Sequence, residues 1–400
     1  MESRDSEPQR VGLTGLRVLD LGRYIAAPFC AQMLANEGAE VIRVEPPEGA
    51  TDREVMPVGI SGRGGLYLQV NNNKKSLTLD YARPEGRAVL EDLIRTADVL
   101  VVNLPGNALK KLRLDYETLR QIKPDLILTT ISAFDPEGES RDKVGFDGTG
   151  QALSGAMYLT GAGERPYRAS ISYVDYATAM SAAFATMAAL LERRITGQGQ
   201  HVQCSLLGTA MTMMNPMLME EASGFRSRRP IGNRSPIAGP SDLFRTKDGW
   251  IMVQVIGDVM FKRWAEFIGK PELVGDPRFA TDSDRGENGE VLSAILAEWC
   301  AERSADECLA ALAERRLPAC RCLSPVETLE LDAFRDYVEP IPLDGAGKTV
   351  PLVTRSVLTA MTGRNDRLPA PHLGADTAEI LGSVGIDTSE MDRLRAAGTI

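Results

Sequence analysis

Histidine is almost absent from this sequence, which has only His201 and His372 among its 400 residues. Two scattered histidines exclude a histidine-rich metal site, and no G-x-S-x-G motif is present to suggest a Ser-His-Asp triad. The six cysteines are also scattered, and the one close pair, Cys320 and Cys322, lacks the C-x-x-C spacing of zinc and redox motifs. We therefore expect no metal site and no prosthetic group.

Glycine motifs for nucleotide binding are missing as well. The stretch after the first predicted strand reads GRYIAA (residues 22–27), with one glycine where the dinucleotide fingerprint G-x-G-x-x-G needs three. No G-x-x-x-x-G-K-[ST] motif occurs in the chain, so P-loop phosphate transfer is unsupported. The sequence therefore disfavours an NAD-dependent enzyme.

An excess of positive charge is lacking too. The formal net charge of −10 argues against a nucleic-acid binder, although it is compatible with a local basic pocket for an anionic ligand. The N-terminal stretch MESRDSEPQRVGLTGL is polar and mixed in charge, unlike a signal or transit peptide. The uncharged run at 176–191 is too short, and too rich in small residues, to span a bilayer comfortably. We expect a cytoplasmic protein with neither a nucleic-acid nor a membrane partner.

In the first half of the chain, strand-like and helix-like segments alternate. This alternation predicts βαβ units and a parallel sheet, hence an α/β fold with a large Rossmann-like domain that lacks the dinucleotide fingerprint. The strand-like runs are at 16–21, 39–45, 75–80, 98–104 and 125–132, and the helical patterns are at 28–38, 84–97 and 115–122.

The composition changes at residues 223–240, SGFRSRRPIGNRSPIAGP, which predicts a linker. Before it we expect a strand at 201–207 and a helix at 208–222, and beyond it a hairpin at 242–255 and helices at 258–269, 289–301 and 305–315. The expected parts are a large Rossmann-like domain at 10–222, the linker at 223–240, a smaller α+β domain at 241–335 and a C-terminal return to the large domain at 336–400.

A lone carboxylate, Asp175, stands before the sixteen uncharged residues 176–191. One interpretation is a helix N-cap, because Asp accepts hydrogen bonds from the first free backbone N–H groups. The other is a catalytic carboxylate at a helix N-terminus, where the helix dipole favours its ionised form. The local sequence alone favours the cap.

Two basic clusters follow predicted strands. One is Lys74 and Lys75 in NNNKKS, and the other is Lys110, Lys111 and Arg113 in NLPGNALKKLRL. Open α/β sheets bind ligands at the carboxyl ends of their strands. Each cluster alone is typical of a solvated surface, but two of them along one edge of an acidic protein favour a phosphate-bearing ligand.

Eight segments occur in an order that resembles the class III coenzyme A transferases, the formyl-CoA and carnitine-CoA transferase family (CaiB/BaiF type). Each segment is a weak signal alone, but eight in order are specific, and the resemblance runs from about residue 13 to the C-terminal segment. The segments are LTGLRVLDLGRYIAAP, GAEVIRVEPPEGATDRE, NNNKKSLTLD, ADVLVVNLPGNAL, GFDGTGQALSG, SYVDYATAMSAAFATMAALLERRITGQGQHVQCSL, DLFRTKDGWIMV and PHLGADTAEIL.

The resemblance implies a role for Asp175. In the family, the Asp at the head of the Ala-rich helix before R-x-T-G-x-G-Q is a covalent nucleophile, so the cap interpretation gives way to the catalytic one. The implied reaction moves CoA from an acyl-CoA donor to a carboxylic acid through a mixed anhydride and an aspartyl-CoA thioester. CoA is then a substrate, and the reaction needs neither ATP nor metal.

The resemblance also implies CoA contacts and an assembly. Family members form homodimers in which each chain is a ring threaded through the other, and we expect this interlocked dimer here. The positions that match the family's CoA-binding residues are Tyr24, Ile25, Ala26, Lys74, Lys75, Asn103, Leu104, Lys111 and Lys143.

Departures from the family pattern bear on the substrate. Ile25 replaces a glutamine beside the acyl group, Pro46 replaces an arginine, and no tetraglycine loop occurs, so formate and oxalate are not the expected substrates. Arg23 and Arg168 are candidates to bracket a second carboxylate, although surface or CoA-phosphate roles fit them equally. We expect a small dicarboxylic or hydroxy acid as acceptor, with succinyl-CoA as donor.

Two alternatives stay open at this point. The family includes α-methylacyl-CoA racemases, which need a His where this chain has Phe146, and Phe cannot move a proton. Asp147 is then a structural acid. A non-catalytic acyl-CoA binding protein is the other alternative, and it would not need Asp175.

Overall fold

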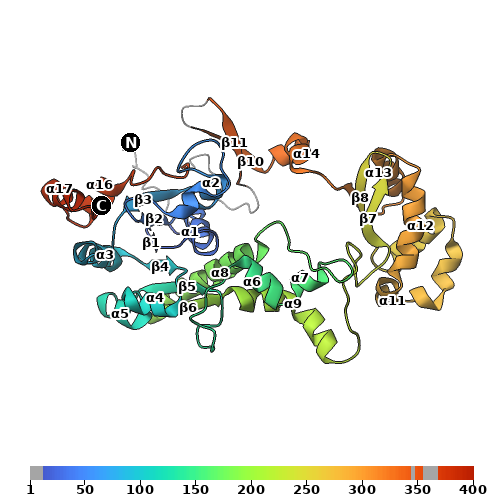
Figure 1. Ribbon diagram of the computed structural model, residues 1–400, viewed down its shortest axis with the longest axis horizontal. Helices are drawn as coiled ribbons and strands as arrows, with labels where there is room; N and C mark the ends of the chain where they lie inside the picture. The colour runs from blue at the N-terminus through green and yellow to red at the C-terminus, as the bar shows by residue number, and fades with distance from the viewer. Residues whose placement is uncertain (1–11, 344–346, 355–367) are drawn as a thin grey trace, which may run out of the picture. The chain divides into compact units, whose positions relative to one another are not determined.

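The computed structural model of the chain describes residues 12–343, 347–354 and 368–400 (Figure 1). The first eleven residues and part of the expected C-terminal return lie outside the described residues. The described chain forms two compact units. The larger unit holds the residues up to Ser154, then Ser170–Pro216 and the chain from Arg335, and the smaller holds Gly155–Ala169 and Met217–Phe334.

A six-stranded parallel sheet is the centre of the larger unit, with the strand order β3-β2-β1-β4-β5-β6. This order reverses between β1 and β4, as in doubly wound dinucleotide-binding folds, where ligands bind at the point of reversal. The predicted α/β fold with a parallel sheet is confirmed. The strands are β1 (Arg17–Asp20), β2 (Glu40–Glu45), β3 (Lys74–Thr78), β4 (Val99–Val102), β5 (Ile127–Ser132) and β6 (Gln200–Ser205).

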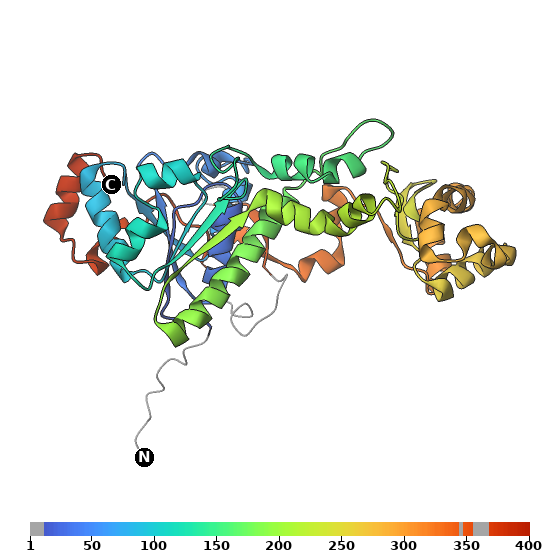
Figure 2. The ribbon, with the colours of Figure 1, turned by 90° about the horizontal axis from the view of Figure 1, so that it is seen from below.

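Helices cover both faces of this sheet (Figure 2). On one face, α1 (Ala26–Asn36) and α8 (Tyr173–Thr196) enclose an apolar core. On the other face, a second core is closed by α3 (Pro84–Thr96), α5 (Tyr116–Ile122), α16 (Thr377–Ser383) and α17 (Thr388–Ala396). Because side chains alternate along a strand, Val99 and Val101 of β4 enter the first core and Leu100 and Val102 the second. The apolar runs in the sequence therefore come from strands buried on both faces.

Helix α8 is by length and composition the one helix among the described residues that is apolar enough to cross a membrane. A single such helix is weak support for a span, because core helices pass the same test. Val174, Ala182 and Leu190 of α8 are buried in the core shared with α1 and the sheet. Packing inside the protein thus accounts for part of its composition, and Gly197, with φ of 69°, ends the helix.

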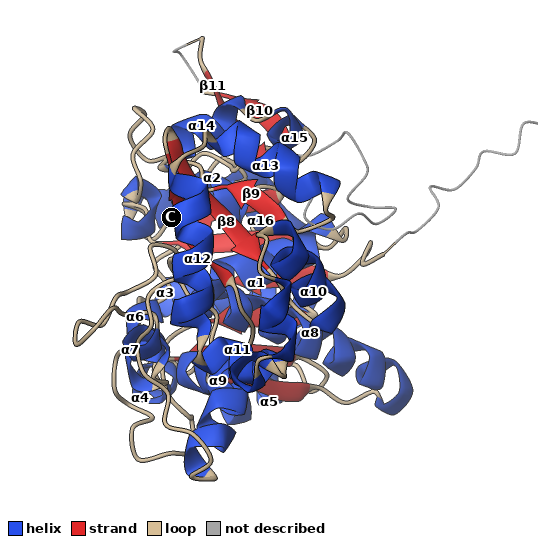
Figure 3. Ribbon diagram, turned by 90° about the vertical axis from the view of Figure 1, so that its right-hand side faces the viewer, coloured by secondary structure: helices blue, strands red, loops and turns tan. Residues whose placement is uncertain are grey.

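The smaller unit contains an antiparallel sheet in the order β7-β8-β9, with helices packed on it (Figure 3). Strands β7 (Ser241–Thr246) and β8 (Gly249–Gln254) form the hairpin predicted at 242–255. The other elements are β9 (Ala319–Arg321), α7 (Ala156–Leu159), α10 (Asp258–Phe267), α11 (Asp282–Glu287), α12 (Gly289–Ala301), α13 (Ala305–Glu314) and α14 (Pro325–Glu330), with short 3-10 turns at Pro271–Gly275 and Pro277–Phe279.

Helix α9 (Leu206–Ala222) begins two residues before the predicted helix and contains Pro216. Several other elements had no clear sequence signal. A hairpin of β10 (Val338–Pro342) and β11 (Thr349–Val353) follows in the larger unit. The remaining short helices are a 3-10 turn at Thr51–Glu54, α2 (Gly65–Asn71), α4 (Gly106–Lys111), α6 (Asp147–Leu153) and α15 (Asp332–Arg335).

Candidate active site

A cavity of about 140 Å³ lies in the larger unit at the carboxyl ends of the strands, where the strand order reverses. Its lining comes from the segments that follow β1, β4 and β5, together with Asp175 at the start of α8. In full, it is lined by Arg23, Tyr24, Ile25, Ala26, Asn103, Pro105, Ile131, Ser132, Ala133, Arg141, Lys143, Val144, Gly145, Phe146, Asp175 and Leu206.

Asp175 lies in the first turn of α8, but it is not the N-cap. The N-cap residue is Ser172, and α8 begins at Tyr173, so Asp175 is the third residue of the helix. The N-cap interpretation of Asp175 is therefore wrong. The helix dipole still favours an anion at this end of α8.

The side chain that caps α8 is that of Asp147. Its Oδ2 accepts hydrogen bonds from the backbone N–H groups of Val174 at 2.8 Å and of Asp175 at 3.4 Å. Asp147 is buried, and its Oδ1 accepts a bond of 2.5 Å from Gln151 Nε2 on the same short helix, α6. Asp147 thus has the structural role expected of it, and the capping bonds do not depend on the side chain of Asp175.

Small residues and one aromatic anchor set the position of this helix end. A methyl group on Gly150 of α6 would come within 2.9 Å of Val174, so glycine permits the close approach of α6 to α8. Next to Asp175, Tyr176 packs edge-on against Phe29 of α1 and donates a hydrogen bond of 2.8 Å to Gln69 Oε1 of α2. The first turn of α8 is therefore tied to α6, α1 and α2.

The structure brings six of the ten residues matched to family functions into one cavity: Asp175, Tyr24, Ile25, Ala26, Asn103 and Lys143. Asn103 contacts the backbone of Arg23 twice, since its Oδ1 accepts from the N–H and its Nδ2 donates to the C=O, at 2.9 and 2.8 Å. Arg23 lines the same cavity, whereas Arg168 belongs to the smaller unit.

The other four matched residues lie elsewhere. The side chain of Lys74 is fully buried and pairs with Asp20 at 2.7 Å, while Lys75 pairs with Glu40 and Glu379 at 2.8 and 2.6 Å. Leu104 lines a separate cavity on the α4 and α5 side of the sheet, and Lys111 is exposed at the end of α4. Both lysines of this cluster thus form ion pairs with carboxylates of the protein itself.

The separate cavity has a volume of about 420 Å³ and shares Ser132 and Arg141 with the first. Its wall includes His201, whose Nε2 lies 2.9 Å from Thr130 Oγ1 and whose ring stacks on Tyr116. Burial lowers the pKa of His201, so the imidazole is neutral at pH 7.

Sequence reasoning missed Arg141 and Ser132 as lining residues. The sequence carried a signal for Arg141, because Arg141 and Lys143 are two basic residues in the segment that follows a buried strand. It carried none for Ser132, which is an ordinary last residue of a strand. Within the described residues, no group of three or more His, Cys, Asp or Glu side chains is placed to hold a metal ion.

Comparison with known proteins identifies the family. Residues 13–377 match the sequence model of CoA-transferase family III. The succinyl-CoA–D-citramalate CoA-transferase of Chloroflexus aurantiacus is 37% identical over 79% of this chain and 80% of its own length, and the succinate–glutarate CoA-transferase of Agrobacterium fabrum is 30% identical over 95% and 97%. The crystal structure of a CaiB/BaiF family protein from Brucella suis is 30% identical, with a TM-score of 0.79 over 94% of this chain and 100% of that one. The chain belongs to CoA-transferase family III, the CaiB/BaiF family, and is a CoA-transferase.

Proposed function

We propose that this enzyme moves CoA from succinyl-CoA to a small dicarboxylic or hydroxy acid through covalent intermediates on Asp175. The names of the two relatives support the choice of substrates, because both act on dicarboxylic acids and one of them on a hydroxy acid, citramalate. The observation that carries the proposal is the position of Asp175 in a cavity with three cationic side chains, those of Arg23, Arg141 and Lys143.

The reaction proceeds by four acyl transfers. The carboxylate of Asp175 attacks the thioester carbonyl of the donor, which gives a mixed anhydride and expels CoA thiolate. The thiolate attacks the aspartyl carbonyl of this anhydride and releases the donor acid, leaving an aspartyl-CoA thioester. The acceptor carboxylate displaces the thiolate to form a second anhydride, and the thiolate then attacks the acceptor's acyl carbonyl and frees Asp175. Thioester energy is thus kept in covalent bonds throughout.

The surrounding side chains fit an anionic acyl-CoA. We assign CoA contacts to Tyr24, Ile25, Ala26, Asn103 and Lys143, which line the cavity with Asp175. Arginine binds carboxylates through two parallel hydrogen bonds, and we assign the free carboxylate of a dicarboxylic acid to Arg23 or Arg141. The racemase alternative is disfavoured, because Phe146 stands at the position where the racemases need a His and the carboxylate of Asp147 caps α8.

Trapping the intermediate tests the mechanism. Incubation with succinyl-CoA, followed by hydroxylamine, should convert Asp175 to its hydroxamate, detectable by peptide mass spectrometry. The isosteric variant Asp175→Asn should bind CoA normally but lose exchange by about three orders of magnitude or more, as nucleophile variants do. Exchange at the wild-type rate by this variant would sink the proposed mechanism.

An acid panel tests the substrate. We expect citramalate, glutarate and other short dicarboxylic or hydroxy acids to form their CoA esters with succinyl-CoA as donor. Arg23→Gln and Arg141→Gln should each be compared on a dicarboxylic acid and the monocarboxylic acid of the same length. Activity confined to monocarboxylic acids would refute the substrate class.

We also assign a cytoplasmic, interlocked homodimer to this enzyme. Helix α8 and the helix after it expose large apolar side chains that a partner chain would cover, among them Phe184 at 78% and Ile195 at 87% exposure. A dimer of about twice 43.4 kDa should persist on dilution to nanomolar concentrations in mass photometry, since threaded rings separate only by unfolding. A folded, active monomer at that dilution would contradict the interlocked arrangement.

A further inference from the structure

The turn after β1 has an unusual set of hydrogen bonds. Its three consecutive backbone N–H groups, at residues 22–24, all donate to side chains, and these side chains come from three different segments of the chain. The bonds are Gly22 N to Asp20 Oδ1 at 2.9 Å, Arg23 N to Asn103 Oδ1 at 2.9 Å and Tyr24 N to Asp52 Oδ2 at 2.7 Å.

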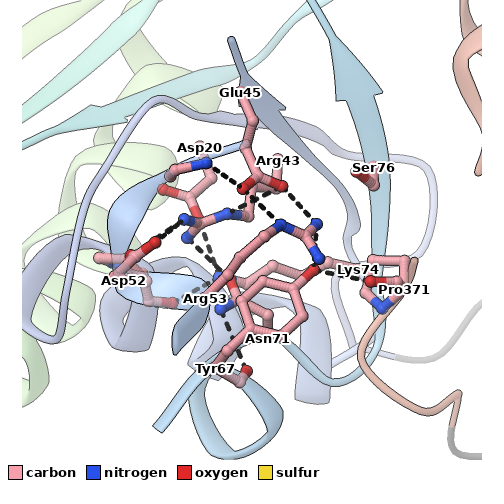
Figure 4. Close-up of polar contacts among 12 residues, drawn as sticks. Asp20, Arg43, Glu45, Asp52, Arg53, Tyr67, Asn71, Lys74, Ser76 and Pro371 are labelled. Carbon is pink, nitrogen blue, oxygen red and sulfur yellow. Dashed lines mark hydrogen bonds and ion pairs between the residues drawn. The ribbon is translucent and has the colours of Figure 1, made fainter. Parts of the chain in front are cut away.

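Two of the three acceptors are buried carboxylates, and each has a buried cation behind it (Figure 4). Arg43 Nη2 donates to both oxygens of Asp52 at 2.8 and 3.0 Å, and Lys74 Nζ donates to Asp20 Oδ2 at 2.7 Å. All four side chains are at most 2% exposed. A buried carboxylate is costly unless it is paired and hydrogen-bonded, so each cation offsets the cost of burying the acceptor beside it.

The two pairs form one network. Asn71 Oδ1 accepts from Arg43 Nη1 at 3.1 Å and from Lys74 Nζ at 2.9 Å, and Lys74 also donates to the C=O of Pro28 in α1 at 2.7 Å. Burial lowers the pKa of Lys74 to about 8, and the charge of Asp20 opposes this effect. The ammonium group is therefore expensive to keep in place without its acidic partner.

The turn itself needs this support. Tyr24 has φ of 63°, a left-handed conformation that is rare for a bulky side chain and persists only when surrounding contacts fix it. Gly22 is packed so closely that an added methyl group would lie 2.5 Å from the Cβ of Ala27. The turn is therefore strained at one residue and has no free space at another.

This turn forms one wall of the cavity that contains Asp175. Tyr24 and Ile25 both line the cavity, and the ring of Tyr24 lies edge-on to that of Phe146 with centroids 6.0 Å apart. Any movement of the Tyr24 backbone would shift this wall relative to Asp175. Misplacement of reacting groups by about 1 Å lowers rates about 100-fold.

We propose that Asp52 is a positioning residue for CoA transfer: its carboxylate oxygen holds the Tyr24 N–H and so fixes the cavity wall that faces Asp175. This proposal rests on the proposed function, since it takes Asp175 as the reacting group. Asp52 is absent from the lining of the cavity and acts through the backbone of Tyr24.

Two double variants separate positioning from folding. Arg43→Met/Asp52→Leu and Arg43→Met/Asp52→Asn both remove the buried ion pair, so neither leaves an unpaired buried charge at these positions. Glu45, the other carboxylate near Arg43, keeps its partner Arg53 at 2.6 Å. Only the Asn variant retains an oxygen that can accept from the Tyr24 N–H.

We expect kcat for exchange to fall about 10- to 100-fold in the Leu variant, and to stay within about threefold of wild type in the Asn variant. Hydrogen–deuterium exchange of the peptide that contains residues 22–26 should be faster in the Leu variant only. The urea midpoints of the two variants show whether they fold equally well. Equal rates and equal amide exchange in the two variants would overturn the proposal.

The amide exchange data do not depend on catalysis, so the proposal is tested even if Asp175 proves not to be the nucleophile. Trapping of the Asp175 adduct in wild type decides the nucleophile separately. If wild type exchanges CoA without an adduct and the Leu variant alone is slow, the mechanism fails while the positioning role of Asp52 stands. If the adduct forms in wild type and both variants form it at the wild-type rate, the positioning role fails while the mechanism stands.

Discussion

The cavity beside Asp175 has one wall from the turn at 22–26 and another from residues 131–146, and the two are held in different ways. The first is fixed by the buried charges of Asp20 and Asp52. The second is held largely by its own turns, and it exposes Val144 at 73% and Phe146 at 61%. Because the second wall is more exposed, we expect it to move at a lower free-energy cost than the first. A CoA-transferase that alternates between two acids gains from one fixed wall and one that adapts.

Removing one cation from each wall should give the largest difference between the walls. Arg43→Ala leaves the buried Asp52 without its cation, and we expect the free energy of unfolding to fall by about 3–5 kcal/mol. Arg141→Ala, in the second wall, removes an exposed side chain whose ion pair with Asp142 is 3.7 Å long, and we expect a change within about 0.5 kcal/mol. Urea unfolding of both variants measures the contrast, and similar losses would show that the walls are equally fixed.

Much of this architecture was predictable because burial leaves a mark on sequence. The strands of the parallel sheet are buried on both faces, so they appear as continuous apolar runs, and β1, β2, β4 and β5 were all predicted within two residues of their ends. Asp175 is conspicuous in the sequence because it is a charge at the head of a long uncharged helix, and because the family motif surrounds it.

Tertiary contacts could not be predicted in the same way. Asp147, which caps α8, lies 27 positions before Val174 in the sequence, and no local sequence pattern predicts such a partner. Lys74 and Lys75 form one basic cluster in the sequence, yet successive strand residues point to opposite faces. Lys74 therefore enters the core beside Asp20 while Lys75 reaches the outer pair with Glu40. The period-two alternation of strands predicts that the two lysines point to opposite faces. Which of the two faces the core depends on the fold and could not be predicted from the sequence.

The space around each wall can be tested with a methyl group. In Gly22→Ala the new Cβ would lie 2.5 Å from Ala27 Cβ and 2.9 Å from Asp20 Oδ1, and overpacking of this kind costs about 1–3 kcal/mol. In Gly138→Ala, in the second wall, the nearest atom is 3.4 Å away, so stability should be nearly unchanged. Thermal unfolding gives both values, and CoA exchange should fall only in Gly22→Ala. If Gly22→Ala left the stability and the exchange rate unchanged, the first wall would have room for an added methyl group.

Charge on the second wall should affect binding more than stability. Lys143 lines the cavity and is exposed, so Lys143→Gln should raise the KM for succinyl-CoA several-fold, about 1 kcal/mol, by removing a charge-assisted contact. The effect should shrink at high salt, because exposed charges are screened. Lys111→Gln is the matched control, since Lys111 lines neither cavity described here. A larger effect in Lys111→Gln would indicate that CoA contacts Lys111 of α4 rather than Lys143.

The smallest effect is expected from the outer ion pairs of β2 and β3, which contrast with the buried pairs one residue away. Burial raises the pKa of Glu40, but hydrogen bonds from Lys75 and Arg17 outweigh it and hold this pKa below 4.5. A carboxyl group whose pKa is lower in the folded state stabilises the protein above pH 4.5, and this contribution is lost as the pH falls through the folded-state pKa. Glu40→Gln should therefore be less stable than wild type at pH 7 by less than about 1 kcal/mol, and the difference should close below pH 4.5. Urea unfolding at several pH values measures it, and a difference that widened in acid would reverse the sign of the pKa shift.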